Sequence, residues 1–291
     1  MTTAAPAAPT GGFGYRHPRA KLVGLLGAPM AWLIVVYLGS LAALFLTAFW
    51  TVDGFTGAVV RTFTLDNFID VFTTPAYLQV MLRTIGIAIS VTVLCLILAV
   101  PVAYFMARVA PHRWQPLLIA MILTPLWASY LVKVYAWRAM LNPESGVIAW
   151  FLQPLGLGGP GFGAVGIIIT LTYLWLPYMV LPVYAGFSRL PNSMLDASAD
   201  LGAKSGRTFR SVIVPMIFPS IVAGSIFTFS LSLGDYITAQ IVGGKTQMLG
   251  NVVQQNYVTN LPFAAAFATI PVIIVLIYLA AVRRSGALEN L

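Results

Sequence analysis

The chain alternates between long apolar runs and shorter segments that carry its charges. Because about 20 mostly apolar residues are needed to cross the hydrocarbon core of a bilayer, such runs predict membrane-spanning helices. Apart from Lys133 they hold no charged side chain, so we expect spans packed by lipid and protein, without a buried proton relay. The sequence therefore predicts an all-α membrane protein with six transmembrane helices, at residues 28–50, 84–107, 117–137, 165–187, 212–233 and 263–282.

The two ends of the chain are polar. Residues 1–21 are rich in Ala, Pro, Gly and Thr and end in basic side chains, so residues 1–27 are predicted to form a disordered cytoplasmic tail. A cleaved signal peptide is the alternative, but the apolar stretch 22–50 exceeds the roughly 7 to 15 residues of a signal's apolar core. Residues 28–283 are predicted to form one transmembrane domain, followed by a cytoplasmic tail at 284–291.

The distribution of Lys and Arg sets the orientation. With the N-terminus inside, 11 of the 16 basic residues fall in cytoplasmic segments. The remaining five share the outer side with most of the acidic residues: Arg61, Arg83, Lys133, Arg138 and Lys245. This positive-inside bias predicts that both termini are cytoplasmic.

The composition excludes several classes of protein. Apolar residues make up 59% of the chain and charged residues 8%, too few for a water-exposed surface. The net charge of +8 does not indicate a nucleic-acid partner, because the sequence has no basic stripe with interleaved aromatic residues. The basic residues lie beside the predicted spans, so membrane topology accounts for the charge. Cys95, the single cysteine, excludes an intrachain disulfide or a thiolate metal cluster and is interpreted as a packing residue.

Several predicted spans contain proline, which frees a backbone carbonyl and bends a helix. For any single proline, irregular packing is the simpler interpretation. The set together favours bent helices that line a path able to open and close, and its members are Pro101, Pro125, Pro177, Pro182, Pro215, Pro219 and Pro271.

The inward connection at 188–211 differs from the others because it encodes two short helices. Pro191 opens the first, Asn192 or Ser193 caps it, and Asp196 completes an approximate capping box. Gly202 supplies the stop. The helix carries an apolar stripe of Met194, Ala197 and Leu201 beside a row of charges formed by Asp196, Asp200 and Lys204. Such a stripe fits a partner's groove, although an ordinary solvated loop helix accounts for it equally well.

The loop also resembles the EAA loop of binding-protein-dependent ABC importer permeases. The elements are Asp196-Ala197-Ser198, then three residues and Gly202, then nine residues and Val212-Ile213-Val214-Pro215. It departs from the family pattern by Asp at 196, Ser at 198, and Val at 212 and 214. The resemblance implies the type I ABC importer permease fold, in which this helix docks into a cytoplasmic ATPase. The residues it implies at that contact are Asp196, Ala197, Ser198, Leu201, Gly202 and Lys204.

Two further pieces are similar to permeases of the spermidine/putrescine type. They are Phe63-Thr64-Leu65-Asp66-Asn67-Phe68, and Ser232-Leu233-Gly234-Asp235-Tyr236-Ile237-Thr238 followed by Gly243-Gly244. The resemblance implies a multi-pass protein of the bacterial inner membrane with three partners: an ATPase dimer, a second and distinct permease chain, and a periplasmic solute-binding protein. The chain has no G-x-x-x-x-G-K-[ST] loop, so ATP and Mg are expected at the ATPase and no cofactor on this chain. Importers for iron, thiamine, sulfate or phosphonate share this layout and remain alternatives.

A path for polyamines should present carboxylates and aromatic faces to a flexible polycation. Asp235 and Tyr236 fit this at the outer end of the fifth span, where a water-filled mouth would keep Asp235 ionised. The aromatic candidates on the third and fourth spans are Trp127, Tyr130, Trp175 and Tyr178, with anchoring at the membrane interface as their alternative role. Lys133 and Arg138 near the outer mouth would repel a polycation. They could equally pair with Glu144 or with a docked partner. If they line the path instead, they favour an anionic substrate such as a phosphonate.

Two other classes of membrane protein compete with an importer subunit. A transporter driven by an ion gradient usually has inverted repeats and intramembrane ionisable groups, which the sequence does not display. A membrane enzyme needs catalytic side chains, but the two histidines, His17 and His112, lie in basic cytoplasmic segments. We therefore expect no catalytic residue and no metal site in this chain.

Overall fold

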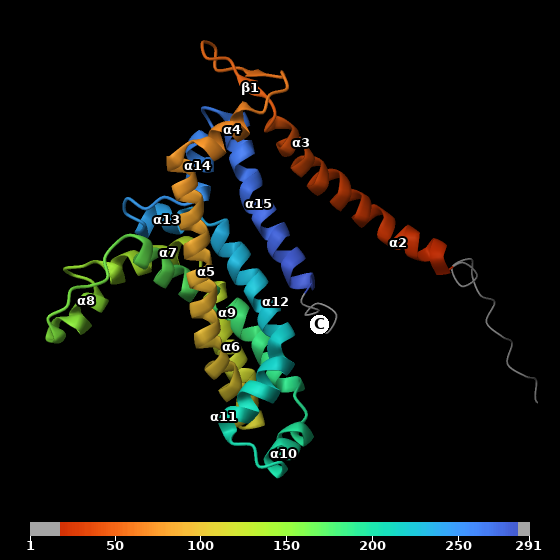
Figure 1. Ribbon diagram of the computed structural model, residues 1–291, viewed down its shortest axis with the longest axis vertical. Helices are drawn as coiled ribbons and strands as arrows, with labels where there is room; N and C mark the ends of the chain where they lie inside the picture. Colours follow the sequence, from red (N-terminus) through yellow and green to blue (C-terminus); the bar gives the residue numbers. More distant parts are fainter. Residues whose placement is uncertain (1–17, 285–291) are drawn as a thin grey trace, which may run out of the picture.

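The computed structural model describes residues 18–284, and within them it is almost entirely helical. Five helices of this part of the chain are long and apolar enough to cross a bilayer, and a helix pair with a 90° bend makes a sixth. The predicted number of six spans is reached when this bent pair is counted as one span. A small hairpin with α4 and α14 lies at one end of the molecule, and α10 and α11 lie at the other (Figure 1). The predicted tail residues 1–17 and 285–291 lie outside the described residues.

The first span leaves the bundle at an angle (Figure 1). It consists of α2 (Pro18–Trp32), a π-helical turn η1 (Leu33–Leu38) and α3 (Gly39–Thr47). Residues 18–27, which the prediction assigned to the tail, are helical in the described part of the chain. The span's most apolar window buries no residue, and contact with the bundle comes at its outer end, where Ala48 packs on α15.

A two-stranded hairpin follows at the outer end. β1 (Thr51–Val52) pairs antiparallel with β2 (Val59–Val60), and α4 (Asp66–Thr73) comes next. The Asp53 carboxylate shapes the turn by accepting hydrogen bonds from the backbone N–H of Phe55 (2.9 Å) and Thr56 (2.8 Å). These bonds stabilise the charged form and lower the pKa of Asp53. Phe55 is fully exposed at the tip.

Three helices make the centre of the bundle: α5 (Pro75–Tyr104), α9 (Ala164–Arg189) and α12 (Val214–Leu233). α5 starts nine residues before the predicted span because the helix continues through Arg83 beyond the apolar run. Its buried face includes Cys95, fully buried with its Sγ 3.5 Å from the Thr172 carbonyl, which confirms the packing role. A π-helical turn, η2 (Phe105–Val109), ends this span at the inner side.

The predicted continuous third span, 117–137, is wrong. A short turn η3 (His112–Trp114) leads into α6 (Gln115–Trp127), the backbone becomes extended at residues 128–129, and α7 (Tyr130–Leu141) leaves at 90°. α7 packs on α9 and on the outer segment that follows α12, so tertiary contacts replace the straight helix that the apolar pattern predicts. After α7 the chain continues on the outer side through α8 (Val147–Leu152) and η4 (Gln153–Leu155).

The remaining elements are short helices at the inner and outer ends of the bundle and the sixth span. α10 (Asn192–Asp200) and α11 (Ser205–Thr208) form the inner loop, and α11 runs through a π-helical turn, η5 (Phe209–Ile213), into α12. The fifth span therefore begins at residue 205, seven residues before the predicted start. On the outer side lie α13 (Ile237–Val242) and α14 (Leu249–Asn256), followed by the sixth span, α15 (Leu261–Arg284).

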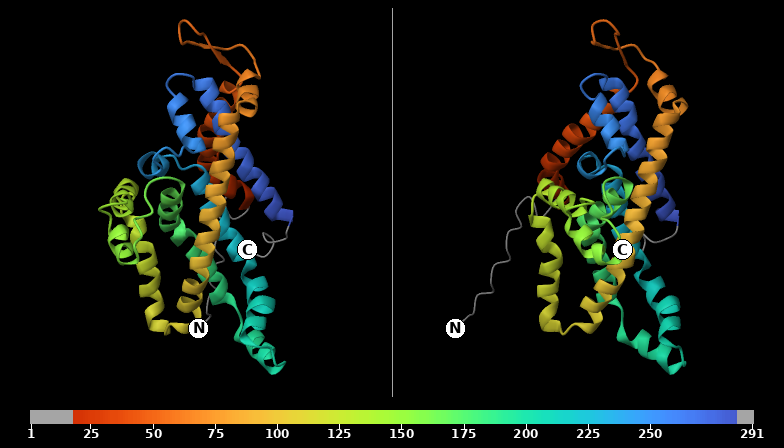
Figure 2. Two further views of the ribbon diagram at one scale, coloured as in Figure 1. Left: turned by 60° about the vertical axis from the view of Figure 1, so that its left-hand side comes forward. Right: turned by 90° about the vertical axis from the view of Figure 1, so that its left-hand side faces the viewer.

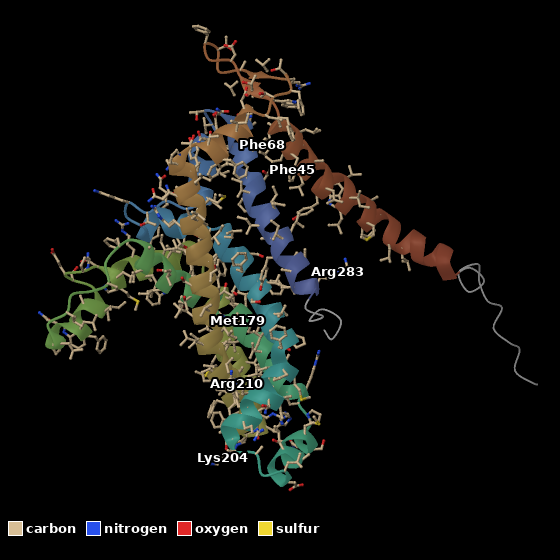
Figure 3. The ribbon with its side chains drawn as sticks, in the orientation of Figure 1. Phe45, Phe68, Met179, Lys204, Arg210 and Arg283 are labelled. Carbon is tan, nitrogen blue, oxygen red and sulfur yellow. The ribbon has the colours of Figure 1, made fainter. Side chains whose placement is uncertain are left out.

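Glycines let α9 and α12 approach closely around Met179, which lies near the middle of the molecule (Figure 3). A Cβ on Gly224 would lie 2.6 Å from the Met179 sulfur and 3.2 Å from its Cα, and one on Gly186 would lie 2.6 Å from the Ser220 hydroxyl. Small residues at such crossings allow the van der Waals contact that holds membrane helices together.

We expect Gly224→Val to destabilise the protein by roughly 1–3 kcal/mol, because the added side chain overpacks the crossing of α9 and α12. The matched control is Gly86→Val on α5, where an added Cβ meets nothing within 4 Å. Thermal unfolding in detergent should show a lower Tm for the first variant than for the second. Equal Tm values would mean that this crossing does not limit stability.

Candidate coupling site and substrate path

The inner loop projects beyond the ends of the bundle (Figure 2). α10 ends at Asp200 and is followed by Leu201 and then Gly202, whose φ of +75° lies in the left-handed region. There the Gly202 N–H donates to the Ala199 carbonyl (2.8 Å) and the Ala203 N–H to the Ser198 carbonyl (3.1 Å), which closes the helix. The predicted helix stop at Gly202 is confirmed. A Cβ there would meet nothing within 4 Å, so the backbone conformation, and not space, requires glycine.

The exposed face of α10 carries the apolar stripe. Leu201 is 88% and Met194 47% exposed, and Ala197 lies between them. Together with Arg207 and Val212 they line a hollow of ≈ 450 Å³ between α10 and the start of the fifth span. A stripe of this kind remains exposed in water only at a cost, which favours a protein partner over the solvated-helix alternative.

The other residues predicted at the coupling contact divide into two groups. Asp196 and Lys204 are exposed beside the stripe and open to a partner. Ser198 is buried, and its hydroxyl lies 2.8 Å from that of Thr208. It therefore joins α10 to α11 within the loop, a role that the spacing of the motif did not predict.

The start of α10 also differs from the prediction. Its N-terminal capping residue is Pro191, no side chain caps it, and the capping box predicted at Ser193 and Asp196 is absent. The Asn192 side chain instead accepts a hydrogen bond from Arg108 at the end of the second span. The partner is 84 residues away, so local sequence holds no signal for it.

On the outer side, Asp235 is 8% exposed and fully engaged within the chain. It accepts hydrogen bonds from the Tyr130 hydroxyl and from the Thr238 N–H (2.8 Å). The hydroxyls of Tyr130 and Thr238 lie 2.7 Å apart, which closes a three-residue network. The expectation of a carboxylate in an open, water-filled mouth is wrong, because α13 and α7 cover it.

The turn that carries Asp235 is held from the opposite side by α14. The Asn251 amide donates to the Tyr236 carbonyl (3.0 Å), and a Cβ on Gly250 would lie 2.8 Å from the Tyr236 Cβ. The Leu249 N–H in turn donates to the Thr84 hydroxyl on α5 (3.0 Å). The turn at the outer end of the fifth span is therefore fixed between three elements.

Aromatic rings continue from this network along the fourth span. Tyr130 stacks on Trp175 with centroids 6.1 Å apart, and Trp175 meets Tyr178 edge-on at 5.8 Å. Tyr178 then contacts Phe227 of α12 at 6.4 Å. We call these four rings the aromatic ladder. The Trp175 indole N–H is shut off from water and has no hydrogen-bond partner within residues 18–284.

The structure thus brings together four of the six predicted path residues and leaves two apart. The four are Asp235, Tyr130, Trp175 and Tyr178. Tyr236 lines a separate groove of ≈ 470 Å³ with residues of α14 and α15. Trp127, at the end of α6, is 92% exposed.

The two basic residues near the outer mouth have different surroundings. Arg138 donates to the Ile241 carbonyl and lies over the Phe162 ring at 5.2 Å. Lys133 is half-buried on α7. Among the described residues, no group of three or more His, Cys, Asp or Glu side chains is arranged to hold a metal ion.

Comparison with solved structures gives the fold. The chain is similar to a subunit of a bacterial alginate ABC transporter crystallised with a pentasaccharide-bound periplasmic protein, with a TM-score of 0.69 over 96% of this chain and 98% of that one, at 12% identity. It is also similar to a chain of the inward-facing MetNI methionine ABC transporter, with a TM-score of 0.56 over 75% of this chain and 100% of that one, at 16% identity. The type I permease fold is confirmed.

Comparison of sequences gives the family. The chain is 43% identical to the inner membrane ABC transporter permease protein YdcU of Escherichia coli K12, over 96% of this chain and 94% of that protein. It is 32% identical to the spermidine/putrescine transport system permease protein PotB of the same organism, over 90% and 96%. Residues 21–284 match the family model described as binding-protein-dependent transport system inner membrane component. The chain therefore belongs to this family and is an inner-membrane permease subunit of an ABC importer.

Proposed function

We propose that this permease imports polyamines of the spermidine and putrescine class. The observation that carries the proposal is the buried Asp235 carboxylate at the head of the aromatic ladder, in a chain 32% identical to a spermidine/putrescine permease. A protonated amine is recognised by a carboxylate together with aromatic faces, and the two stand next to each other here.

The hydrogen-bond network offers a way to hold and release a cation. A buried carboxylate is costly unless its oxygens are paired, and the Tyr130 hydroxyl and the Thr238 N–H supply that pairing. An ammonium group that reached Asp235 would replace the Tyr130 hydroxyl with a charge-assisted bond. The rings of Trp175 and Tyr178 would then provide the next faces along the span.

The surroundings of Arg138 favour a cation over an anion. Its guanidinium is committed to the Ile241 carbonyl and the Phe162 ring, so it serves the packing of α7 against α13. A phosphonate or sulfate would need a free cationic donor in the path. Of the two basic residues considered for the path, Lys133 would have to supply it, and we therefore keep the anionic substrates as the second candidate.

Coupling to ATP hydrolysis would pass through α10. Its exposed stripe of Met194, Ala197 and Leu201 fits the groove of a cytoplasmic ATPase dimer, with Asp196 and Lys204 at the edge. ATP and Mg would bind there, and this chain would bind neither. The first span buries no residue of its apolar window within this chain, which leaves it free to pack on a second, distinct permease. The outer loops, with Phe55 exposed at the hairpin tip, would receive a periplasmic binding protein.

The coupling role can be tested at Gly202. A valine there is forced into the left-handed conformation at a cost of roughly 1–2 kcal/mol, so we expect Gly202→Val to distort the turn after α10 and uncouple ATP hydrolysis from uptake. Gly202→Asn, which tolerates that conformation, should retain coupling, as should Gly206→Val, where an added Cβ meets nothing within 4 Å. The measurement is solute uptake per ATP hydrolysed in membrane vesicles. Normal coupling by Gly202→Val would remove this turn from the mechanism.

The role of Asp235 can be tested by removing its charge. We expect Asp235→Asn to reduce spermidine uptake roughly tenfold or more, because a hydrogen bond to a charged group contributes roughly 1.5–3 kcal/mol. Asp70→Asn, at an exposed position on α4, is the matched control and should leave uptake unchanged. Radiolabelled spermidine uptake by cells expressing each variant at equal level is the measurement. Equal uptake by both variants would place Asp235 outside the path.

The partners and substrate can be tested together by purifying tagged chain from native membranes. We expect an ATPase with phosphate-binding loops, a second permease and a periplasmic protein that binds radiolabelled spermidine or putrescine. A co-purified protein that binds phosphonate or sulfate instead would replace the substrate assignment. Solute transport by the chain alone in liposomes without ATP would contradict the ABC mechanism.

A further inference from the structure

We propose that Arg108 is a positioning residue that ties the second span to the coupling helix, so that movement of the ATPase reaches α5 directly. The proposal requires only that the chain is an ABC importer permease and is independent of the solute. It rests on the contacts of one guanidinium group and on how α10 is connected to the bundle.

The Arg108 guanidinium spans the junction between α9 and α10. One terminal nitrogen, Nη1, donates to the Asn192 side-chain oxygen (2.7 Å), and the other, Nη2, donates to the Leu190 carbonyl. These acceptors flank Pro191, which has no N–H to offer. Leu190 is buried in the core, while Asn192 is the first residue of α10. A single planar group therefore holds the end of the fourth span and the start of the coupling helix in one geometry.

The head group has few alternative partners. Its Nε is buried and has no hydrogen-bond partner within residues 18–284. Arg108 is half-buried: its bond to the Leu190 carbonyl is partly shielded from water and its bond to Asn192 is exposed. Both bonds are charge-assisted, and such bonds are stronger than those between neutral groups. This distinguishes Arg108 from the exposed basic residues of the inner side, such as Lys204 and Arg210 at the lower end of Figure 3.

Chain connectivity shows why such a link matters. α10 follows α9 directly and leads through α11 and η5 into α12, so two of the three central helices are joined to it by backbone. α5 has no such link, although its inner end packs on α9 through Tyr104 and Phe187, whose ring centroids lie 5.5 Å apart. No side chain caps α10, and the Arg108 bond to Asn192 links its first turn to the second span.

A π-helical turn lies in each of the two spans that this link would connect, at the inner end of the second span and at the start of the fifth. Arg108 lies in η2, and the loop re-enters the bundle through η5. Such wide turns are rare and occur frequently at functional sites. With η2, the guanidinium, α10 and η5 in series, a displacement of α10 acts on α5 and α12 together.

The test uses the complete transporter in proteoliposomes with its binding protein. Four variants are compared with the wild type: Arg108→Ala, Asn192→Ala, the double variant and Asn192→Asp, with Arg113→Ala at an exposed neighbouring position as control. The readouts are basal ATP hydrolysis, its stimulation by the binding protein from the outside, and radiolabelled spermidine imported per ATP hydrolysed.

We expect Arg108→Ala to keep basal hydrolysis but to lower both the stimulation and the transport per ATP by about tenfold, the effect of losing a charge-assisted bond. Asn192→Ala should do the same more weakly, and the double variant should be no worse than Arg108→Ala because both residues act through one contact. Asn192→Asp, which offers the guanidinium a carboxylate, should couple normally.

Normal stimulation and transport per ATP in Arg108→Ala would overturn the proposal. If Arg108→Ala fails to assemble, Asn192→Ala, which removes only one acceptor, serves as the test. Unchanged coupling in Asn192→Ala would overturn the proposal. Weakened coupling with intact basal hydrolysis would support it. If the wild type does not import spermidine, the polyamine assignment is rejected. The role of Arg108 would still be tested by the stimulation of ATP hydrolysis, because that measurement needs no identified solute.

Discussion

Close packing between α9 and α12 is the contact on which the rest of this structure depends. Lipid is as apolar as the side chains of the spans, so burial alone does not hold such helices together, and close backbone approach at small residues does. Gly186 and Gly224 allow that approach. α5 packs along both helices, and its inner end is linked to the coupling loop through Arg108. On the outer side, α12 leads directly into the turn that carries Asp235. The two glycines thus hold together the helices that carry the coupling loop and this turn.

The sequence predicted what local pattern controls. Apolar runs give the number of spans, because each span must satisfy its own backbone hydrogen bonds within about 20 residues. The stop at Gly202 followed from one residue and its conformational freedom. The fold could be assigned further because the loop motif resembles a known family. Helix ends were less accurate, since α5 and the fifth span continue beyond their apolar segments into polar surroundings.

What the sequence did not predict depends on contacts between distant residues. The break before Tyr130 is stabilised by a hydrogen bond to Asp235, 105 residues away, and no local signal specifies a 90° bend. Asp235 was expected in water because it follows an apolar run, but α7 and α13 fold over it. Ser198 fits the family motif by spacing, yet its hydroxyl serves the loop itself. In each case the residue type indicated that the position mattered, but the contacts of the side chain depended on tertiary structure.

The π-helical turn η5 makes the register between loop and span unusually sensitive to length. Each residue of an α-helix advances the chain by about 100° around the axis, and a π turn accommodates one residue more than an α turn. Deleting a single residue within Phe209–Ile213 would convert the turn to ordinary helix and rotate α11, and with it α10, by about that angle relative to α12. The exposed stripe would then face away from its present direction. Gain or loss of one residue is usually harmless in a surface loop, but here it would change the direction of the surface proposed to contact the ATPase.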